Sequence, residues 1–199
     1  MRLHFTLFLF LIVTFTQSQN NISIKITSLS YQFTETQADI IKMKLSNNGQ
    51  LAFEPGLILG YEGFASPSTA LKFSQFVLLD KAMHIAGSTQ LMLKIKLIKS
   101  FKNSIYFAVG PGLFYRQSWS NIEDYADESI YNESSGWQYK FSWFSGEIEY
   151  NYYLSKYSDI TISINHTQAE SIGIAFGLKY WINKNPGKKH GCVSCPGLH

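Results

Sequence analysis

Apolar residues alternate with small or polar residues along the segment 171–182, near the end of the chain. Successive side chains of a β-strand point to opposite faces, so this segment has one apolar face and one small or polar face. The same two-residue period occurs in seven other segments, at 41–45, 53–62, 71–80, 91–97, 104–116, 141–154 and 160–165. This pattern predicts an all-β protein, and strands of about ten residues are typical of a transmembrane β-barrel.

Two features favour an up-and-down antiparallel barrel over a secreted β-sandwich. The polar face repeatedly combines glycine with charged residues, as the narrow, filled interior of a small barrel requires. The connecting segments also fall alternately at two ends, and the long segment 117–138 lies at one of them. Bacterial barrels keep their long loops outside the cell and their short turns in the periplasm. We therefore predict eight strands, with ten as the alternative. A secreted sandwich that binds a ligand stays open, because its strands also have one solvated face.

The first 18 residues are typical of a secretory signal peptide. Arg2 supplies a positive charge, residues 5–15 are almost all apolar, and Ser18 ends a small-residue cleavage site. We therefore expect export to the outer membrane. Because bacterial single-chain barrels have an even number of strands, we assign the barrel to 37–182 and interpret 19–36 as a periplasmic lead-in, although 22–26 also alternates. Residues 183–199 are predicted to form a basic periplasmic tail.

Composition narrows the expected partners. The net charge of +3 is small, and no basic stripe is interleaved with aromatic residues, which argues against nucleic acid. Aromatic residues make up 16% of the chain, in agreement with the Tyr and Trp girdles of membrane proteins. We expect no cofactor. The expected partners are outer-membrane lipid and lipopolysaccharide, together with a surface ligand or a periplasmic protein.

The alternation also predicts which charged residues point into the barrel. They are Lys42, Lys44, Glu54, Glu62, Lys72, Lys94, Lys96, Arg116, Glu147 and Glu149. Buried charges are tolerated only when they are paired and hydrogen-bonded. Because the interior of an eight-stranded barrel is filled by side chains, these residues predict a closed ionic plug and not an open pore.

A short polar segment, 166–171, contains the residue types of a hydrolase site. His166, Glu170 and Ser171 offer a base, a carboxylate and a hydroxyl. The segment weakly resembles the eight-stranded lipid A deacylases, in which a His is followed two residues later by a Ser and further on by a Glu. Here Gln168 takes the position of that Ser. We interpret His166 as an interfacial residue and keep the lipid-modifying hydrolase as the alternative function.

The loop from 117 to 136 carries acidic residues and no Lys or Arg. Its acidic residues are Glu123, Asp124, Asp127, Glu128 and Glu133. Calcium prefers oxygen ligands of this kind, but the spacing of known calcium loops is missing. We interpret the segment as a solvated acidic loop, with a partner or cation as the alternative.

The tail contains both cysteines of the chain. Cys192 and Cys195 lie between His190 and His199. In an oxidising compartment a disulfide between the two cysteines is the first interpretation. Two thiolates and two imidazoles also match a tetrahedral zinc site, which is the alternative.

As a whole, the chain after the signal resembles the small barrels of Gram-negative outer membranes, in particular the outer-membrane protein X and outer-membrane protein W groups. This resemblance rests on the strand pattern and not on a specific motif. It implies the architecture and not the function. Our first hypothesis for the function is a non-enzymatic integral outer-membrane protein whose surface loops contact the envelope or a ligand.

Overall fold

The computed structural model describes residues 19–32, 45–46, 50–80, 82–120, 131–167 and 171–182. The strands in these ranges are β1 (Asn20–Gln32), β2 (Leu51–Phe64), β3 (Thr69–Leu79), β4 (Ile85–Lys99), β5 (Asn103–Gln117), β6 (Asn132–Ser134), β7 (Trp137–Tyr153), β8 (Ser158–Thr167) and β9 (Ser171–Trp181). Within these ranges, no helix is long and apolar enough to cross a membrane.

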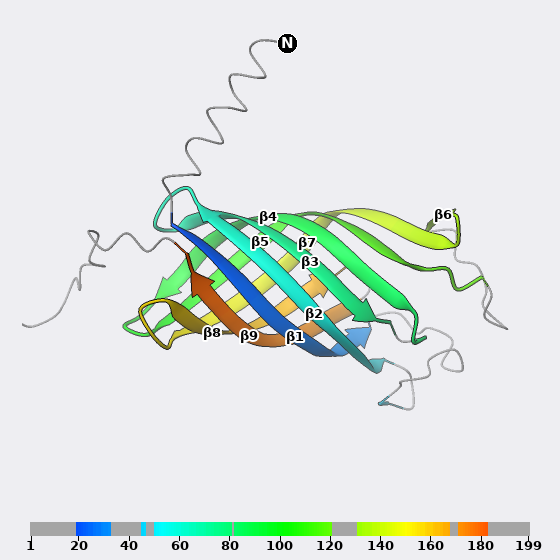
Figure 1. Cartoon of the computed structure of the whole chain (residues 1–199), viewed down its shortest axis with the longest axis horizontal. Coiled ribbons are helices and arrows are strands. Elements are labelled where there is room, and N and C mark those ends of the chain that lie inside the picture. The colour runs from blue at the N-terminus through cyan, green and yellow to red at the C-terminus, as the bar shows by residue number, and fades with distance from the viewer. Residues whose placement is uncertain are drawn as a thin grey trace, which may run out of the picture.

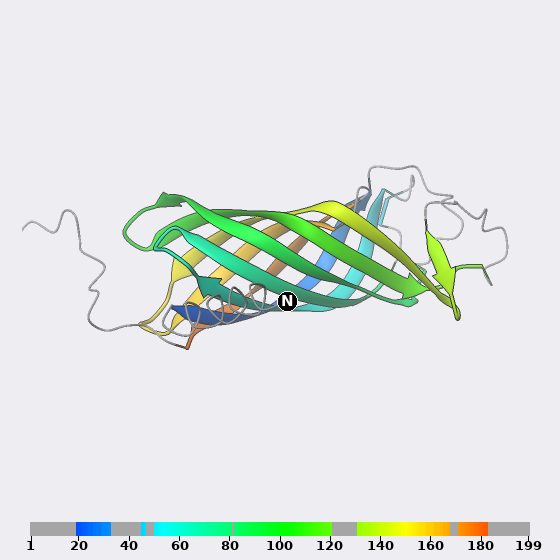
Figure 2. The same ribbon diagram turned by 90° about the horizontal axis from the view of Figure 1, so that it is seen from above.

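The strands close into a barrel (Figures 1 and 2). Consecutive strands pair antiparallel from β1 to β5, β5 pairs with β7, and β7 to β9 continue the order. β1 pairs with both β2 and β9, which closes the sheet. Of the nine strands, β6 pairs only with β7 over three residues, so the barrel itself has eight strands. The predicted eight-stranded, up-and-down antiparallel barrel is confirmed.

The predicted start of the barrel was wrong. Residues 20–32, assigned to a periplasmic lead-in, form β1 and complete the barrel between β2 and β9. A bulge between Thr27 and Leu29 shifts the phase of β1 by one residue. For this reason the alternation seen in the sequence stops at Ile26, and the even strand number then excluded this segment from the barrel. The segment expected to be the first strand, 37–46, lies outside the described residues except for 45–46.

The two faces of the barrel are inverted relative to a soluble protein. Ile24, Phe176 and Leu178 are exposed on the outer face, whereas Ser23, Lys25 and Thr161 are buried inside. Hydrocarbon accepts apolar side chains but no unpaired backbone groups, and a closed barrel satisfies both conditions. This arrangement is the one that a transmembrane barrel requires.

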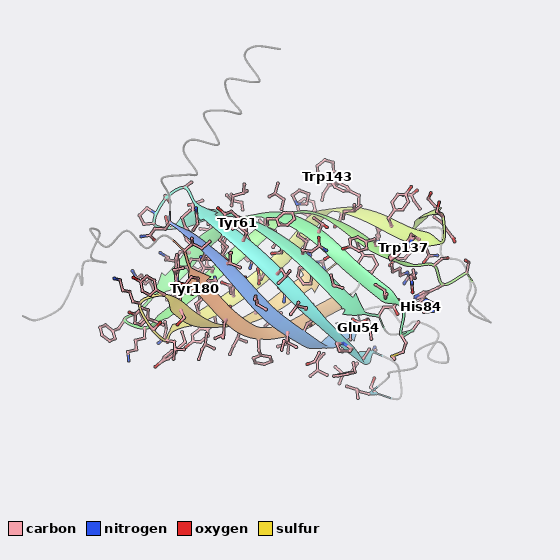
Figure 3. The ribbon with its side chains drawn as sticks, in the orientation of Figure 1. Glu54, Tyr61, His84, Trp137, Trp143 and Tyr180 are labelled. Carbon is pink, nitrogen blue, oxygen red and sulfur yellow. The ribbon has the colours of Figure 1, made fainter. Side chains whose placement is uncertain are left out.

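The two ends of the barrel differ in their connections. At the inner end, which holds the start of β1 and the end of β9, the links are the short turns 65–68, 100–102 and 154–157. At the outer end, the links include 33–50 and 118–136, the latter carrying β6. Figure 3 shows Tyr61 and Tyr180 toward the inner end, and Glu54, His84 and Trp137 toward the outer end.

Candidate functional site: the charged lumen and the outer wall

Seven charged side chains from six strands meet in the inner half of the lumen. This charge cluster consists of Lys25 on β1, Glu62 on β2, Lys72 on β3, Lys94 on β4, Glu147 and Glu149 on β7, and Lys179 on β9. Each side chain is at most 3% exposed. Charges this deeply buried persist only where each one has partners.

Glu149 is contacted by all four lysines of the cluster. Its Oε2 accepts hydrogen bonds from Nζ of Lys25 at 2.6 Å and of Lys72 at 2.9 Å. Its Oε1 accepts from Nζ of Lys94 at 2.5 Å and from Lys179. A single carboxylate therefore joins lysines from four strands, β1, β3, β4 and β9, to β7.

Glu62 forms the inner-end side of the cluster. Its Oε1 accepts from Lys94 at 2.6 Å and from Lys179 at 3.0 Å. Its Oε2 accepts from the side-chain amide of Asn21 at 3.0 Å. The ammonium of Lys94 also lies 4.5 Å from the centre of the Tyr106 ring, within cation–π range. Each oxygen of Glu62 thus has a donor although the side chain has no contact with water.

Glu147 forms the opposite side of the cluster. It accepts hydrogen bonds from Lys25 and Lys72, and Lys25 also donates to the hydroxyl of Ser163 at 3.0 Å. Because lysine side chains are long, they reach across the lumen from their own strands to the two glutamates of β7. The cluster therefore ties opposite walls of the barrel together.

Aromatic side chains close the lumen at the inner end. The rings of Phe64 and Trp181 lie 5.4 Å apart and form a buried cluster with Ala70 and Tyr106. The indole nitrogen of Trp181 donates to Asp159 at 2.7 Å, so the one polar group of this ring is satisfied. These rings separate the charge cluster from the inner end.

The outer half of the lumen is filled differently, by small and apolar residues and by uncharged polar side chains such as Gln90 and Asn165. Ile58, Phe76 and Ala175 form a buried apolar cluster. Gly112 faces Ser145 so closely that an added Cβ would lie 2.5 Å from the serine Oγ. A residue without a side chain is needed here because side chains from the adjacent strands β4 and β7, Gln90 and Ser145, already fill the space in front of Gly112.

A second aromatic closure lies at the outer end. The guanidinium of Arg116 is 3.8 Å from the ring centre of Trp119 and 4.2 Å from that of Tyr131. Its Nε donates to Gln138 at 2.9 Å, and the buried Trp119 donates its indole N–H to Asp80 at 2.7 Å. Arg116 therefore holds Trp119 and Tyr131 close together at the outer end of the barrel.

The structure places the predicted lumen residues at three different levels. It brings together Glu62, Lys72, Lys94, Glu147 and Glu149 in the charge cluster. Three other residues lie elsewhere. Lys96 lies at the inner rim, where its ammonium donates to the Pro67 carbonyl. Arg116 belongs to the outer closure, and Glu54 is half-buried at the outer end (Figure 3). Lys42 and Lys44 lie outside the described residues.

Sequence reasoning missed two members of the charge cluster, for different reasons. Lys25 was assigned to the lead-in, because eight other segments had been counted as strands and an even number left no place for 22–26. Lys179 does follow the alternation of β9, opposite Leu178 and Tyr180, and its place on the polar face was sufficient to identify it. Four inward lysines therefore meet three glutamates in the inner half.

A bulge in β7 places two adjacent aromatic rings on the outer face of the barrel. Between the pairs Gly110↔Ser145 and Gly112↔Ser142, β7 has one residue more than β5. Trp143 and Phe144 are 72% and 75% exposed there, and Trp143 points away from the barrel in Figure 3. The Ser142 hydroxyl donates to the Phe144 carbonyl at 3.1 Å and accepts from the Phe144 N–H at 3.3 Å.

Two arguments place the outer boundary of the hydrocarbon at this bulge. First, β8 pairs with β7 only as far as His166, opposite Gly146, and open sheet edges do not occur within hydrocarbon. Second, a transmembrane strand has about nine to eleven residues, which counted from Tyr153 at the inner end of β7 leads to residues 143–145. Both arguments leave 137–142 outside the hydrocarbon.

We call this protruding part the outer wall. It consists of β6, residues 137–142 of β7 and the paired residues 112–117 of β5. Its outward side includes the exposed rings of Trp137, Tyr139 and Phe141, and Trp137 lies edge-on to Tyr115 at 6.3 Å. A contiguous apolar surface of this kind, outside the membrane, is typical of an interaction site.

The residues of the suggested hydrolase site do not converge. Residues directly opposite in adjacent strands share a face of the sheet. His166 pairs with Ile172, whereas Ser171 pairs with Thr167. The register therefore places His166 and Ser171 on opposite faces of the sheet. Glu170 lies outside the described residues.

The other sequence candidates fall mostly outside the described residues. Among the acidic-loop residues, Glu133 is described; it is exposed and accepts a hydrogen bond from Ser118 at 2.6 Å. The acidic residues outside the described ranges are Glu123, Asp124, Asp127 and Glu128, and the tail residues His190, Cys192, Cys195 and His199 also lie outside them. No group of three or more His, Cys, Asp or Glu side chains within the described ranges is arranged to hold a metal ion.

Comparisons with known proteins show similarity in fold but not in sequence family. No family model and no curated protein matches the sequence. A crystal structure of Ail, the attachment invasion locus protein of Yersinia pestis, is similar with 12% identity and a TM-score of 0.51, over 82% of this chain and 98% of that one. The N-terminal barrel domain of Pseudomonas aeruginosa OprF has 12% identity and a TM-score of 0.46, over 83% and 99%. The P. aeruginosa outer membrane protein OprG has 10% identity and a TM-score of 0.41, over 84% and 98%.

The chain therefore has the fold of the small eight-stranded barrels of outer membranes. This agrees with the architecture expected from the resemblance to the outer-membrane protein X and W groups. The similarity to lipid A deacylases is not established by these comparisons.

Proposed function

We propose that the protein is a non-enzymatic, integral protein of the outer membrane that uses the outer wall to bind lipopolysaccharide or another surface ligand. The observation that carries this proposal is the filled lumen. The charge cluster, the inner aromatic closure and the Arg116 closure occupy the interior at three levels. Because the lumen of this barrel is filled, a ligand has to bind to the exterior surface.

The outer wall is the part of that exterior best suited to binding. Aromatic rings such as Tyr139 and Trp137 combine a large apolar body with a polar tip. They stand just beyond the hydrocarbon boundary, where the saccharide part of lipopolysaccharide surrounds an outer-membrane protein. The nearby bulge at Trp143 and Phe144 would hold the barrel at the depth that exposes this surface.

Binding of purified lipopolysaccharide to the folded protein tests the proposal. The double variant Tyr139→Ser/Phe141→Ser should weaken binding by about tenfold or more, since aromatic anchors dominate binding surfaces of this type. Ile182→Ser, which removes an exposed apolar side chain at the inner end, is the matched control and should leave binding unchanged. Equal binding by wild type and the double variant would contradict the proposal that the outer wall is the binding surface.

A further inference from the structure

The inner rim of the barrel carries exposed lysines and no exposed acidic side chain among the described residues. Lys99 and Lys102 flank the turn between β4 and β5, and Lys156 lies in the turn between β7 and β8; all three are exposed. The acidic side chains of the inner half are Glu62, Glu147, Glu149 and Asp159, each buried. Exposed charge at this end is therefore positive only. We call Lys99, Lys102 and Lys156 the basic rim.

The two lysine-bearing turns are neighbours and not separate features. The N–H of Tyr153 donates to the Lys102 carbonyl at 2.8 Å, and the Tyr150 hydroxyl donates to Asn103 at 2.7 Å. These bonds join the start of β5 to the end of β7, so the turns stand side by side. The basic rim is therefore one continuous surface.

Apolar side chains lie within the same surface. Phe101, between two lysines of the basic rim, is 82% exposed, the highest value among the large apolar residues described. Leu154 and Tyr157 are exposed in the adjacent turn, and the ammonium of Lys156 lies 5.1 Å from the Tyr157 ring centre. A fully solvated phenylalanine at the tip of a turn is unfavourable, so this surface requires a partner that covers apolar groups as well as pairing with positive charge.

We infer that the basic rim binds the headgroups of anionic phospholipids in the inner leaflet, while Phe101 inserts between their acyl chains. The inference rests on the proposed integral position of the barrel in the outer membrane. Lysines close to an anionic leaflet are attracted to it, and their apolar stems remain near the hydrocarbon while the ammonium groups reach the phosphates.

Two observations favour lipid over a soluble anionic partner. The apolar residues of the rim continue the lipid-facing row of β4, where Leu97 and Ile98 are exposed next to the bulge that follows Lys96. In addition, the rim lies at the inner end of strands whose outer boundary is the bulge at Trp143. The end of the β7–β8 pairing at Gly146 places this outer boundary independently of strand length, so the rim lies at the opposite boundary.

Association of spin-labelled lipids with the reconstituted full-length protein tests the inference. Spin-labelled phosphatidylglycerol should associate more strongly than spin-labelled phosphatidylcholine at low ionic strength, by about two- to fivefold for each lysine that contacts a headgroup. The preference should fall at high salt, because exposed charges are then screened. Lys102→Gln/Lys156→Gln should bring the ratio of the two association constants close to one. The charge-retaining Lys102→Arg/Lys156→Arg should keep it.

The outcomes separate this inference from the proposed function. Wild-type protein that is folded in the bilayer but shows no preference for phosphatidylglycerol overturns the inference and leaves the membrane barrel standing. An unchanged preference in the Gln variant also overturns it, and loss of the preference in both the Gln and the Arg variants would assign the effect to geometry and not to charge. Protein that never enters the bilayer contradicts the proposed function itself. The wild-type salt series needs no variant, so the test holds even if a substitution prevents folding.

Discussion

The two halves of the lumen are filled by opposite means. The inner half contains seven charged side chains that pair with one another across the barrel. The outer half contains Gly112, Ser145 and a small apolar cluster around Phe76, with charge again only at the outer closure. The inner half is held by long charged side chains that reach across the lumen, whereas the outer half is packed with small residues that leave room for the side chains of adjacent strands.

This difference indicates how each half should respond to mutation. In the inner half every charge depends on its partners, so removal of one leaves the others buried and unpaired. In the outer half the limiting quantity is space, so addition of atoms is more harmful than removal of a hydrogen bond.

The largest effect is expected for Glu149→Ala. This change leaves four lysine ammonium groups without their shared carboxylate and should lower the free energy of unfolding by about 3–5 kcal/mol. Urea titration, followed by the mobility difference between unheated and heated samples on a gel, measures the change. Glu133→Ala, at an exposed position of the outer wall, is the comparison and should change stability by less than about 1 kcal/mol. Equal stability of the Glu149 variant and wild type would contradict the central role of the cluster.

A smaller effect is expected for Gly110→Ala near the middle of the lumen. An added Cβ would meet the backbone of Leu91 and Met92, which has no rotamer to relieve the contact. Overpacking of this kind costs about 1–3 kcal/mol. Gly146→Ala is the matched control, because its added Cβ would have neighbours no closer than 3.9 Å. If both variants unfold at the same urea concentration, close packing does not hold this part of the barrel.

The smallest effect, a spectroscopic one, locates the point where the outer half leaves the membrane. In vesicles of brominated phosphatidylcholine, Trp143→Phe should reduce the total quenching of tryptophan fluorescence, because Trp143 contacts lipid. Trp137→Phe should not reduce it, because Trp137 stands six positions further out on the same strand, beyond the hydrocarbon. If quenching depends equally on both residues, the outer boundary of the hydrocarbon lies further out, and the outer wall is inside the membrane.

The sequence predicted the two faces of most strands because alternation is a local property. Lys72, Lys94, Glu62, Glu147 and Glu149 were all identified from it. Alternation does not predict the position of a residue along the barrel axis. For this reason Arg116 and Glu54 were grouped with residues that they do not contact. Height depends on strand tilt and on the register between neighbouring strands, which are set by contacts distant in the sequence.

Two bulges account for the misplaced start of the barrel and for the outward rings of β7, whereas Lys179 was missed on a strand that alternates regularly around it. The bulge after Thr27 divided β1 into two short patterns, and the even strand number then excluded Lys25 from the barrel. The bulge in β7 put Trp143 and Phe144 on the same face, although adjacent residues of a regular strand point apart. The bulge after Thr27 has no glycine or proline at its centre that would reveal it in the sequence, whereas the bulge in β7 lies opposite Pro111, between Gly110 and Gly112 of β5.

The closed lumen is the central claim, and ion conductance across a planar bilayer tests it most directly. Purified, folded protein inserted into a bilayer should give no large, steady conductance, because the aromatic closures and the charge cluster fill the barrel at three levels. A large, steady conductance from the wild-type protein, in proportion to the number of barrels inserted, would contradict this account.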